Sequence, residues 1–86
     1  MSAIGQIQNI TAAADALKKA GHYKAAMVKY AQAYDLACLA KPSSAICLVG
    51  AQSAIEIGEV EAAAAMARRG LEIAPQATEL LKFVTH

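Results

Sequence analysis

Residues 14–33 read ADALKKAGHYKAAMVKYAQA, and residues 51–70 read AQSAIEIGEVEAAAAMARRG. Residue 51 aligns with residue 14 and residue 70 with residue 33, a constant offset of 37 that matches small or apolar residues at seven pairs of positions. Each stretch has a glycine between two runs whose apolar residues recur every three or four positions, as they do on one face of a helix. The sequence therefore predicts two helix hairpins, one after the other. The matched pairs include Ala14 with Ala51, Gly21 with Gly58, Ala26 with Ala63, and Ala33 with Gly70.

The composition supports helices and excludes several classes of protein. Of the 86 residues, 57% are hydrophobic and 17% are charged, with a formal net charge of +1. Disordered chains combine low hydrophobicity with high net charge, and nucleic-acid-binding domains carry an excess of Lys and Arg. The 22 alanines favour helix but supply little core volume, since alanine has the highest helix propensity and only one methyl group. We therefore expect an all-α domain with closely packed helices and no nucleic-acid partner. No stretch of the sequence approaches the roughly 18 consecutive apolar residues that span a bilayer, so we expect no membrane partner either.

Glycine, proline and serine residues divide the chain into five predicted helical segments. Gly21 and Gly58 interrupt helices, Pro42 and Pro75 cannot lie inside them, and Ser43 and Ser44 are suited to cap a helix start. Alternating β-branched runs, the mark of strands, are absent from the sequence. The segments run from about Ser2 or Gly5 to Lys19, Tyr23 to Leu39, Ser43 to Ile57, Glu59 to Ala74, and Gln76 to Val84.

The repeated pattern resembles the tetratricopeptide repeat family, whose unit of about 34 residues is a helix hairpin with small residues at the contact between its helices. The resemblance implies a short right-handed α-solenoid of antiparallel hairpins, with one repeat at about 7–40, a second at about 44–75 and a capping helix at about 76–84. The matching positions are the turn glycines Gly21 and Gly58, the following residues Tyr23 and Val60, the contact alanines Ala26 and Ala63, the second-helix pair Tyr30 and Ala67, the second small pair Ala33 and Gly70, and the closing Pro75.

In the resembled family, ligands lie in a groove lined by the first helix of each hairpin. The resemblance therefore implies a partner-binding groove with a mixed polar and apolar lining, which suits a peptide segment. Leu48 and Ile55 could equally be packed against a neighbouring helix, and both readings stay open here. The groove residues implied by the resemblance are Gln8, Thr11, Asp15, Lys18, Leu48, Gln52, Ile55, Glu79 and Lys82.

Large side chains are scarce, so the few that exist are candidates for core or contact positions. We expect Tyr23 and Tyr30 to be core aromatics and Tyr34 to be an exposed anchor, because tyrosine joins an apolar ring to a polar tip. A homodimer would enlarge a thin core. We therefore expect Tyr34, Leu80 and Phe83 to form an oligomer surface.

The residues that could carry catalysis or bind a metal are sparse and scattered. Cys38 and Cys47 are expected to be free thiols of a reducing compartment, the cytoplasm, since a disulfide scaffold carries more cysteines. Glu56, Glu59 and Glu61 lie on a helix turn and are expected to be solvated. The chain lacks a Gly-x-Ser-x-Gly turn, a phosphate loop and a Cys/His cluster with zinc spacing. No cofactor and no catalytic residue is predicted.

The sequence therefore predicts a non-catalytic module that binds another protein or a peptide as an adaptor, chaperone or inhibitor. A protein that assembles only with itself is the alternative, and an enzyme that uses Cys47 or Cys38 is a third reading. The start of the chain lacks a basic segment followed by an apolar run, so we expect no secretory signal.

Overall fold

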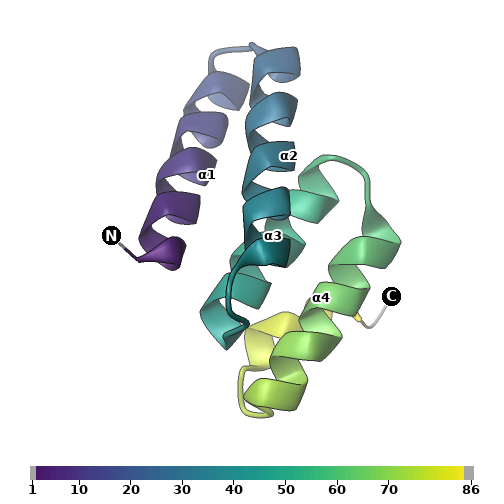
Figure 1. Ribbon diagram of the computed structural model, residues 1–86. Coiled ribbons are helices and arrows are strands. Elements are labelled where there is room, and N and C mark those ends of the chain that lie inside the picture. Colours follow the sequence, from purple (N-terminus) through teal and green to yellow (C-terminus); the bar gives the residue numbers. More distant parts are fainter. Residues whose placement is uncertain (1, 85–86) are drawn as a thin grey trace.

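The computed structural model describes residues 2–84, and within them it contains helices and no strands (Figure 1). The expected all-α fold, with consecutive helices packed against one another as hairpins, is confirmed. The second helix has the predicted ends and the first helix ends at Lys19 as predicted, while the other ends of the α-helices differ by one or two residues. The last segment differs in kind, because it is a short 3₁₀ helix. The elements are α1 (Ala3–Lys19), α2 (Tyr23–Leu39), α3 (Ser44–Glu56), α4 (Val60–Ile73) and η1 (Thr78–Phe83).

Two helices begin at serine caps. The hydroxyl of Ser2 accepts a hydrogen bond from the Gly5 backbone N–H at 3.2 Å, which satisfies one of the unpaired amides at the start of α1. At α3 the hydroxyl of Ser43 accepts from the Ile46 N–H at 3.1 Å. The expected capping role of Ser43 is therefore confirmed, and this cap fixes where the second hairpin begins.

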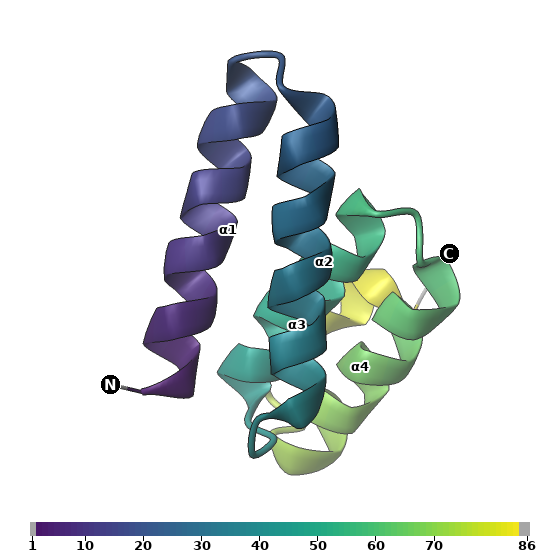
Figure 2. The same ribbon diagram turned by 45° about the horizontal axis from the view of Figure 1, so that its top comes forward.

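The two hairpins turn in the same way. Gly21 has φ +86° and Gly58 has φ +79°, the left-handed region that glycine adopts without steric cost. The N–H of the next residue bonds back across the turn at 2.8 Å in both cases, from His22 to the Leu17 carbonyl and from Glu59 to the Ala54 carbonyl. Both first helices therefore end in the same way, with a glycine in the left-handed conformation and a hydrogen bond back across the turn. Each turn sends the second helix back beside the first, as Figure 2 shows.

Alanine lies where the helices touch. Ala14 and Ala26 are 0% exposed in the first hairpin, and Ala51 and Ala63 are 0% exposed in the second. Side chains this small let neighbouring helix axes approach closely. Where α2, α3 and α4 meet, even a methyl group is too large, since a Cβ on Gly50 would lie 2.9 Å from the Ala37 Cβ.

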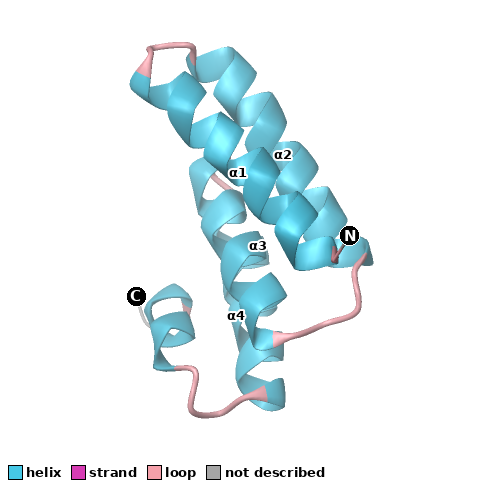
Figure 3. Cartoon of the chain, turned by 90° about the vertical axis from the view of Figure 1, so that its left-hand side faces the viewer, coloured by secondary structure: helices cyan, strands magenta, loops and turns pink. Residues whose placement is uncertain are grey.

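Large apolar side chains gather where η1 covers the second hairpin. Figure 3 shows the two hairpins inclined to each other, with η1 against the second one and away from the first. Leu80 is 0% exposed and Phe83 is 6% exposed, and both belong to the chain's own core. The prediction that they form an exposed oligomer surface was wrong, because Gly70 leaves room for Leu80 against α4.

Tyr30 and Tyr23 have different surroundings. Tyr30 is 3% exposed and packs with Ala14 and Ala26 in a small second cluster, so its expected core position is confirmed. Tyr23 is 62% exposed, and its expected core position was wrong. It is the first residue of α2, directly after the turn, where α1 has already ended.

Candidate functional site

Three adjoining hollows follow α1, α3 and η1, and we call them together the inner groove. The turn hollow, of about 420 Å³, shares Asp15 with the central hollow, of about 270 Å³. The cap hollow, of about 360 Å³, shares Gln52 and Glu56 with the central hollow. The turn hollow is lined by Asp15, Lys18, Lys19 and Tyr23, the central hollow by Thr11, Asp15, Tyr30, Gln52, Ser53 and Glu56, and the cap hollow by Gln52, Ile55, Glu56, Lys82 and Phe83.

The groove residues implied by the sequence divide into two sets. The structure brings six together along the inner groove: Thr11, Asp15, Lys18, Gln52, Ile55 and Lys82. Gln8, Leu48 and Glu79 lie outside the three hollows. Leu48 is half-buried and packs against the larger core cluster, so of the two alternatives, groove or core, Leu48 belongs to the core. Ile55 is 39% exposed in the cap hollow, so its side chain is available to a partner.

A polar network ties the central hollow to the three helices around it. The hydroxyl of Tyr30 on α2 donates to Asp15 Oδ1 on α1. Lys18 Nζ on α1 lies 2.8 Å from Glu56 Oε2 and 3.2 Å from Glu56 Oε1 on α3. Glu56 is partly exposed, as expected of a solvated carboxylate, and in addition it pairs with Lys18 across the hairpins. Glu59 and Glu61 are exposed, as expected.

The network fixes the protonation of its members. Burial, and then the hydrogen bond to Asp15, raises the pKa of Tyr30 far above its ordinary value. The Glu56 carboxylate raises the pKa of Lys18 through their hydrogen bond and charge attraction. At neutral pH the phenol of Tyr30 is therefore a proton donor to Asp15, and Lys18 is a cation.

Ser53 is the one buried side-chain polar group without a hydrogen-bond partner among residues 2–84. It is 1% exposed and lies on α3 at the wall of the central hollow. An unpaired buried hydroxyl costs about 1–3 kcal/mol, so native proteins keep few of them. The sequence did not predict a role for Ser53, because its only signal there is a hydroxyl close to the small residues Ala51 and Ala54.

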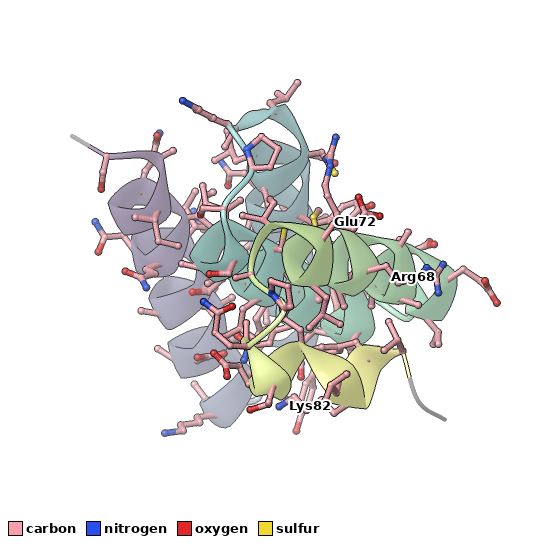
Figure 4. The ribbon with its side chains drawn as sticks, turned by 90° about the horizontal axis from the view of Figure 1, so that it is seen from below. Arg68, Glu72 and Lys82 are labelled. Atoms are coloured by element: carbon pink, nitrogen blue, oxygen red, sulfur yellow. The ribbon has the colours of Figure 1, made fainter. Side chains whose placement is uncertain are left out.

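The cap hollow combines apolar surface with one cation. Phe83 forms its floor, and Lys82 Nζ lies 5.2 Å from the centre of the Phe83 ring, within the range of a cation–π contact. Figure 4 places Lys82 beneath the ribbon of η1, whereas Arg68 and Glu72 lie along α4. This end of the inner groove suits an apolar side chain beside an acidic or polar group.

Tyr34 on α2 is half-buried instead of exposed. It lines a separate hollow of about 250 Å³ with Cys38, Ala62, Ala65, Met66 and Arg69. A hydrogen bond with Cys38, and then burial, raises the pKa of Tyr34 to about 12. The prediction that Tyr34 is exposed was therefore wrong.

The two cysteines are both unpaired, as expected, with Cys38 exposed and Cys47 buried. Burial raises the pKa of the Cys47 thiol, which lowers its thiolate fraction at neutral pH. Among residues 2–84 no group of three or more His, Cys, Asp or Glu side chains could hold a metal ion. No helix in the same range is long and apolar enough to cross a membrane.

Comparison of the chain with protein-family models, with curated proteins and with solved structures finds no match.

Proposed function

We propose that the chain is a non-catalytic protein-interaction module, built as a short tetratricopeptide-like array, whose inner groove binds a peptide segment of another protein. The observation that carries the proposal is the continuity of the groove. Residues from α1, α3 and η1, far apart in the sequence, line three hollows, of which the central one shares Asp15 with the turn hollow and Gln52 and Glu56 with the cap hollow. A groove of this kind offers pockets for successive side chains of one extended ligand.

The lining supports a peptide better than a small molecule. The hollows are open and mixed in chemistry, with carboxylates and hydroxyls in the centre and Ile55 and Phe83 at the cap end. Small-molecule sites are enclosed and mainly apolar, with a few convergent polar groups. The unpaired thiols fit a reducing compartment, and we extend the proposal to the cytoplasm on that ground.

The test begins with a displayed library of random peptides that is selected on the full chain. The affinity of a selected peptide is then measured by fluorescence anisotropy for the wild type and two variants. Ile55→Glu places a carboxylate in the cap hollow, and we expect at least a roughly tenfold loss of affinity, the equivalent of about 1.4 kcal/mol. Val28→Glu is the matched control, because Val28 is 68% exposed on α2 and lines none of the hollows described.

Two results would overturn the proposal. One is a selection that yields no binding peptide. The other is an Ile55→Glu variant that keeps full affinity while circular dichroism shows unchanged helix content, since the groove would then not be the binding surface.

Self-assembly as a homodimer is the second candidate, and one observation favours it. Val28 and Leu39 are 68% and 84% exposed, and they lie eleven residues apart on α2, close to three helical turns. Two large apolar side chains on one helix face are a surface that a second copy could cover. Sedimentation over a concentration series tests this: the wild type is expected to associate and Val28→Glu to remain monomeric. A wild type that stays monomeric throughout rejects the homodimer.

A further inference from the structure

The central hollow contains a buried hydrogen-bonding group with nothing to bind. Ser53 Oγ is shielded from solvent and has no partner among residues 2–84, although the side chain borders a hollow of about 270 Å³. Buried hydroxyls in native proteins are nearly always paired with protein, with ordered water or with a bound group. The unpaired oxygen therefore points to a ligand that completes it.

The other polar groups of the hollow decide what that ligand must supply. Two of its three hydroxyl donors are already used, since Tyr30 donates to Asp15 Oδ1 and Thr11 donates to the Gln8 carbonyl at 3.0 Å, while the Ser53 hydroxyl can still donate or accept. Free acceptors remain on Asp15 Oδ2, on Ser53 Oγ and on the lone pairs of the Thr11 hydroxyl. The hollow therefore offers more free acceptor sites than free hydroxyl donors, which makes it complementary to a group rich in N–H.

The charge of the hollow leads to the same kind of group. Two carboxylates line it, Asp15 and Glu56, and the ammonium of Lys18 hydrogen-bonds to Glu56 and attracts Asp15 more weakly. The phenol of Tyr30 stays protonated and adds no compensating charge for Asp15. One negative charge is left over, so a cation is attracted and the carboxylate end of a peptide is repelled.

We propose that the central hollow binds the guanidinium group of an arginine side chain in the partner peptide, with Asp15 and Glu56 as its charge partners and Ser53 Oγ as a further acceptor. A guanidinium carries five N–H donors in a planar fork, which suits acceptors that come from two different helices, α1 and α3. This inference rests on the proposed function and specifies the partner chemistry of the same groove.

Replacement of Lys18 should raise the affinity of the hollow for arginine. Its ammonium occupies both oxygens of Glu56, so an arriving guanidinium must share that carboxylate with it. Replacing Lys18 by the uncharged Met removes the competitor and makes the hollow more negative. Lys18→Met should therefore bind the arginine side chain more tightly, whereas most substitutions in a binding site weaken binding.

The test is a titration of the ¹⁵N-labelled full chain with N-acetyl-arginine amide, followed by amide chemical shifts. We expect the largest shifts at the backbone amides around Asp15, Gln52 and Ser53. The matched probe is N-acetyl-citrulline amide, which keeps the shape of arginine without its charge, and it should leave these amides unchanged. N-acetyl-lysine amide tests the planar fork, and it should bind more weakly than the arginine probe.

The variants separate binding from folding. Ser53→Ala removes a hydroxyl that has no partner in the fold, so urea unfolding should be unchanged or more stable, while the affinity for the arginine probe falls several-fold. Asp15→Asn should lower that affinity by roughly tenfold. Glu61→Gln is the matched control, because it neutralises an exposed carboxylate on α4 outside the groove and should change nothing.

Several results would overturn the inference: arginine shifts that are absent or lie outside the hollow, equal binding of the citrulline or lysine probe, or equal affinities of the Ser53→Ala, Asp15→Asn and Glu61→Gln variants. These results are distinct from a failure of the proposed function. If the arginine probe fails while Ile55→Glu still abolishes binding of a selected peptide, the groove binds peptides and the guanidinium assignment is wrong. If Ile55→Glu has no effect on any selected peptide, the proposed function itself falls.

Discussion

The side chain of Leu80 occupies the space that Gly70 leaves open. A Cβ atom on Gly70 would lie 2.6 Å from Leu80 Cδ1 and 2.8 Å from the Cβ of Cys47, both closer than real Cβ contacts. The short helix η1 is held against α4 through this fit, since Leu80 is fully buried there. Because Phe83 of the same helix forms the floor of the cap hollow, the Gly70–Leu80 contact also positions one end of the inner groove.

Gly70→Ala should therefore destabilise the chain, although alanine is the better helix former. The added methyl forces Leu80 or Cys47 to move, an overpacking cost of roughly 1–3 kcal/mol against a helix-propensity gain of about 1 kcal/mol. The free energy of unfolding in urea measures the balance. Gly5→Ala is the control: the nearest atom to its Cβ is the hydroxyl of Ser2 at 3.1 Å, the end of an exposed side chain, so a much smaller effect is expected.

A double variant shows whether the cost comes from Leu80. Leu80→Ala alone should cost about 2–5 kcal/mol, since it empties a fully buried position. With Leu80 truncated, Gly70→Ala should become less destabilising, and the two effects should fall short of additivity. Strict additivity would show that the methyl on Gly70 is accommodated elsewhere.

The sequence predicts helix ends well because the signals for them are local. Gly21 and Gly58 carry positive φ values, and Ser43 caps α3, each as its own position in the sequence indicates. The burial of Leu80 depends instead on Gly70, which belongs to a different helix and comes close only when the chain folds back between α4 and η1. Periodicity along one segment shows which residues share a face, but not what that face meets.

The same distinction holds for the inner groove. Of the nine groove residues that the resemblance implied, six line the hollows, because hairpin geometry places the first helices of successive hairpins side by side. The contacts that define the chemistry of the groove, Tyr30 with Asp15 and Lys18 with Glu56, join residues of different helices. Their pairing depends on the register between helices, which a sequence pattern with offset 37 does not specify.

The two hairpin turns should respond equally to the loss of glycine. An added Cβ meets nothing within 4 Å at Gly21 or at Gly58, so the cost of alanine is only the left-handed backbone, about 1–2 kcal/mol at each position. Urea unfolding of Gly21→Ala and Gly58→Ala measures both. A chain made by chemical synthesis with D-alanine at the same position is the control, because a D-residue favours positive φ and should not destabilise. Unequal losses for the two L-alanine variants would contradict the equivalence of the turns.

Stability should fall in alkaline solution through Tyr30. Its pKa is raised in the folded chain, by burial and by Asp15, above the value of 10.0 of a free tyrosine. The stabilisation is thus complete below about pH 10 and is lost as the pH rises toward the folded pKa, because the unfolded chain ionises first. The tyrosinate absorbance and the urea midpoint, both followed against pH, report this.

Tyr30→Phe is the variant that isolates this phenol. It should lose about 1 kcal/mol at neutral pH, the typical net value of one hydrogen bond, and the latest step of the tyrosinate titration should disappear. Tyr34→Phe is the comparison, because Tyr34 titrates at about 12 through its contact with Cys38. An unchanged late step in Tyr30→Phe would show that another tyrosine is responsible for it.

Thiol labelling should distinguish the two cysteines and at the same time report on the stability of the second hairpin. Cys38 is exposed on α2 and should react with a maleimide reagent at once, whereas Cys47 is 1% exposed and its raised pKa leaves little thiolate. In Cys38→Ser the remaining thiol should therefore be labelled slowly, by way of opening of the fold. Its labelling rate should rise with urea, and it should rise again in Gly70→Ala, where the added methyl lies 2.8 Å from the Cβ of Cys47. Rapid labelling of Cys38→Ser without urea would contradict the burial of Cys47 and with it the close packing of α3, α4 and η1.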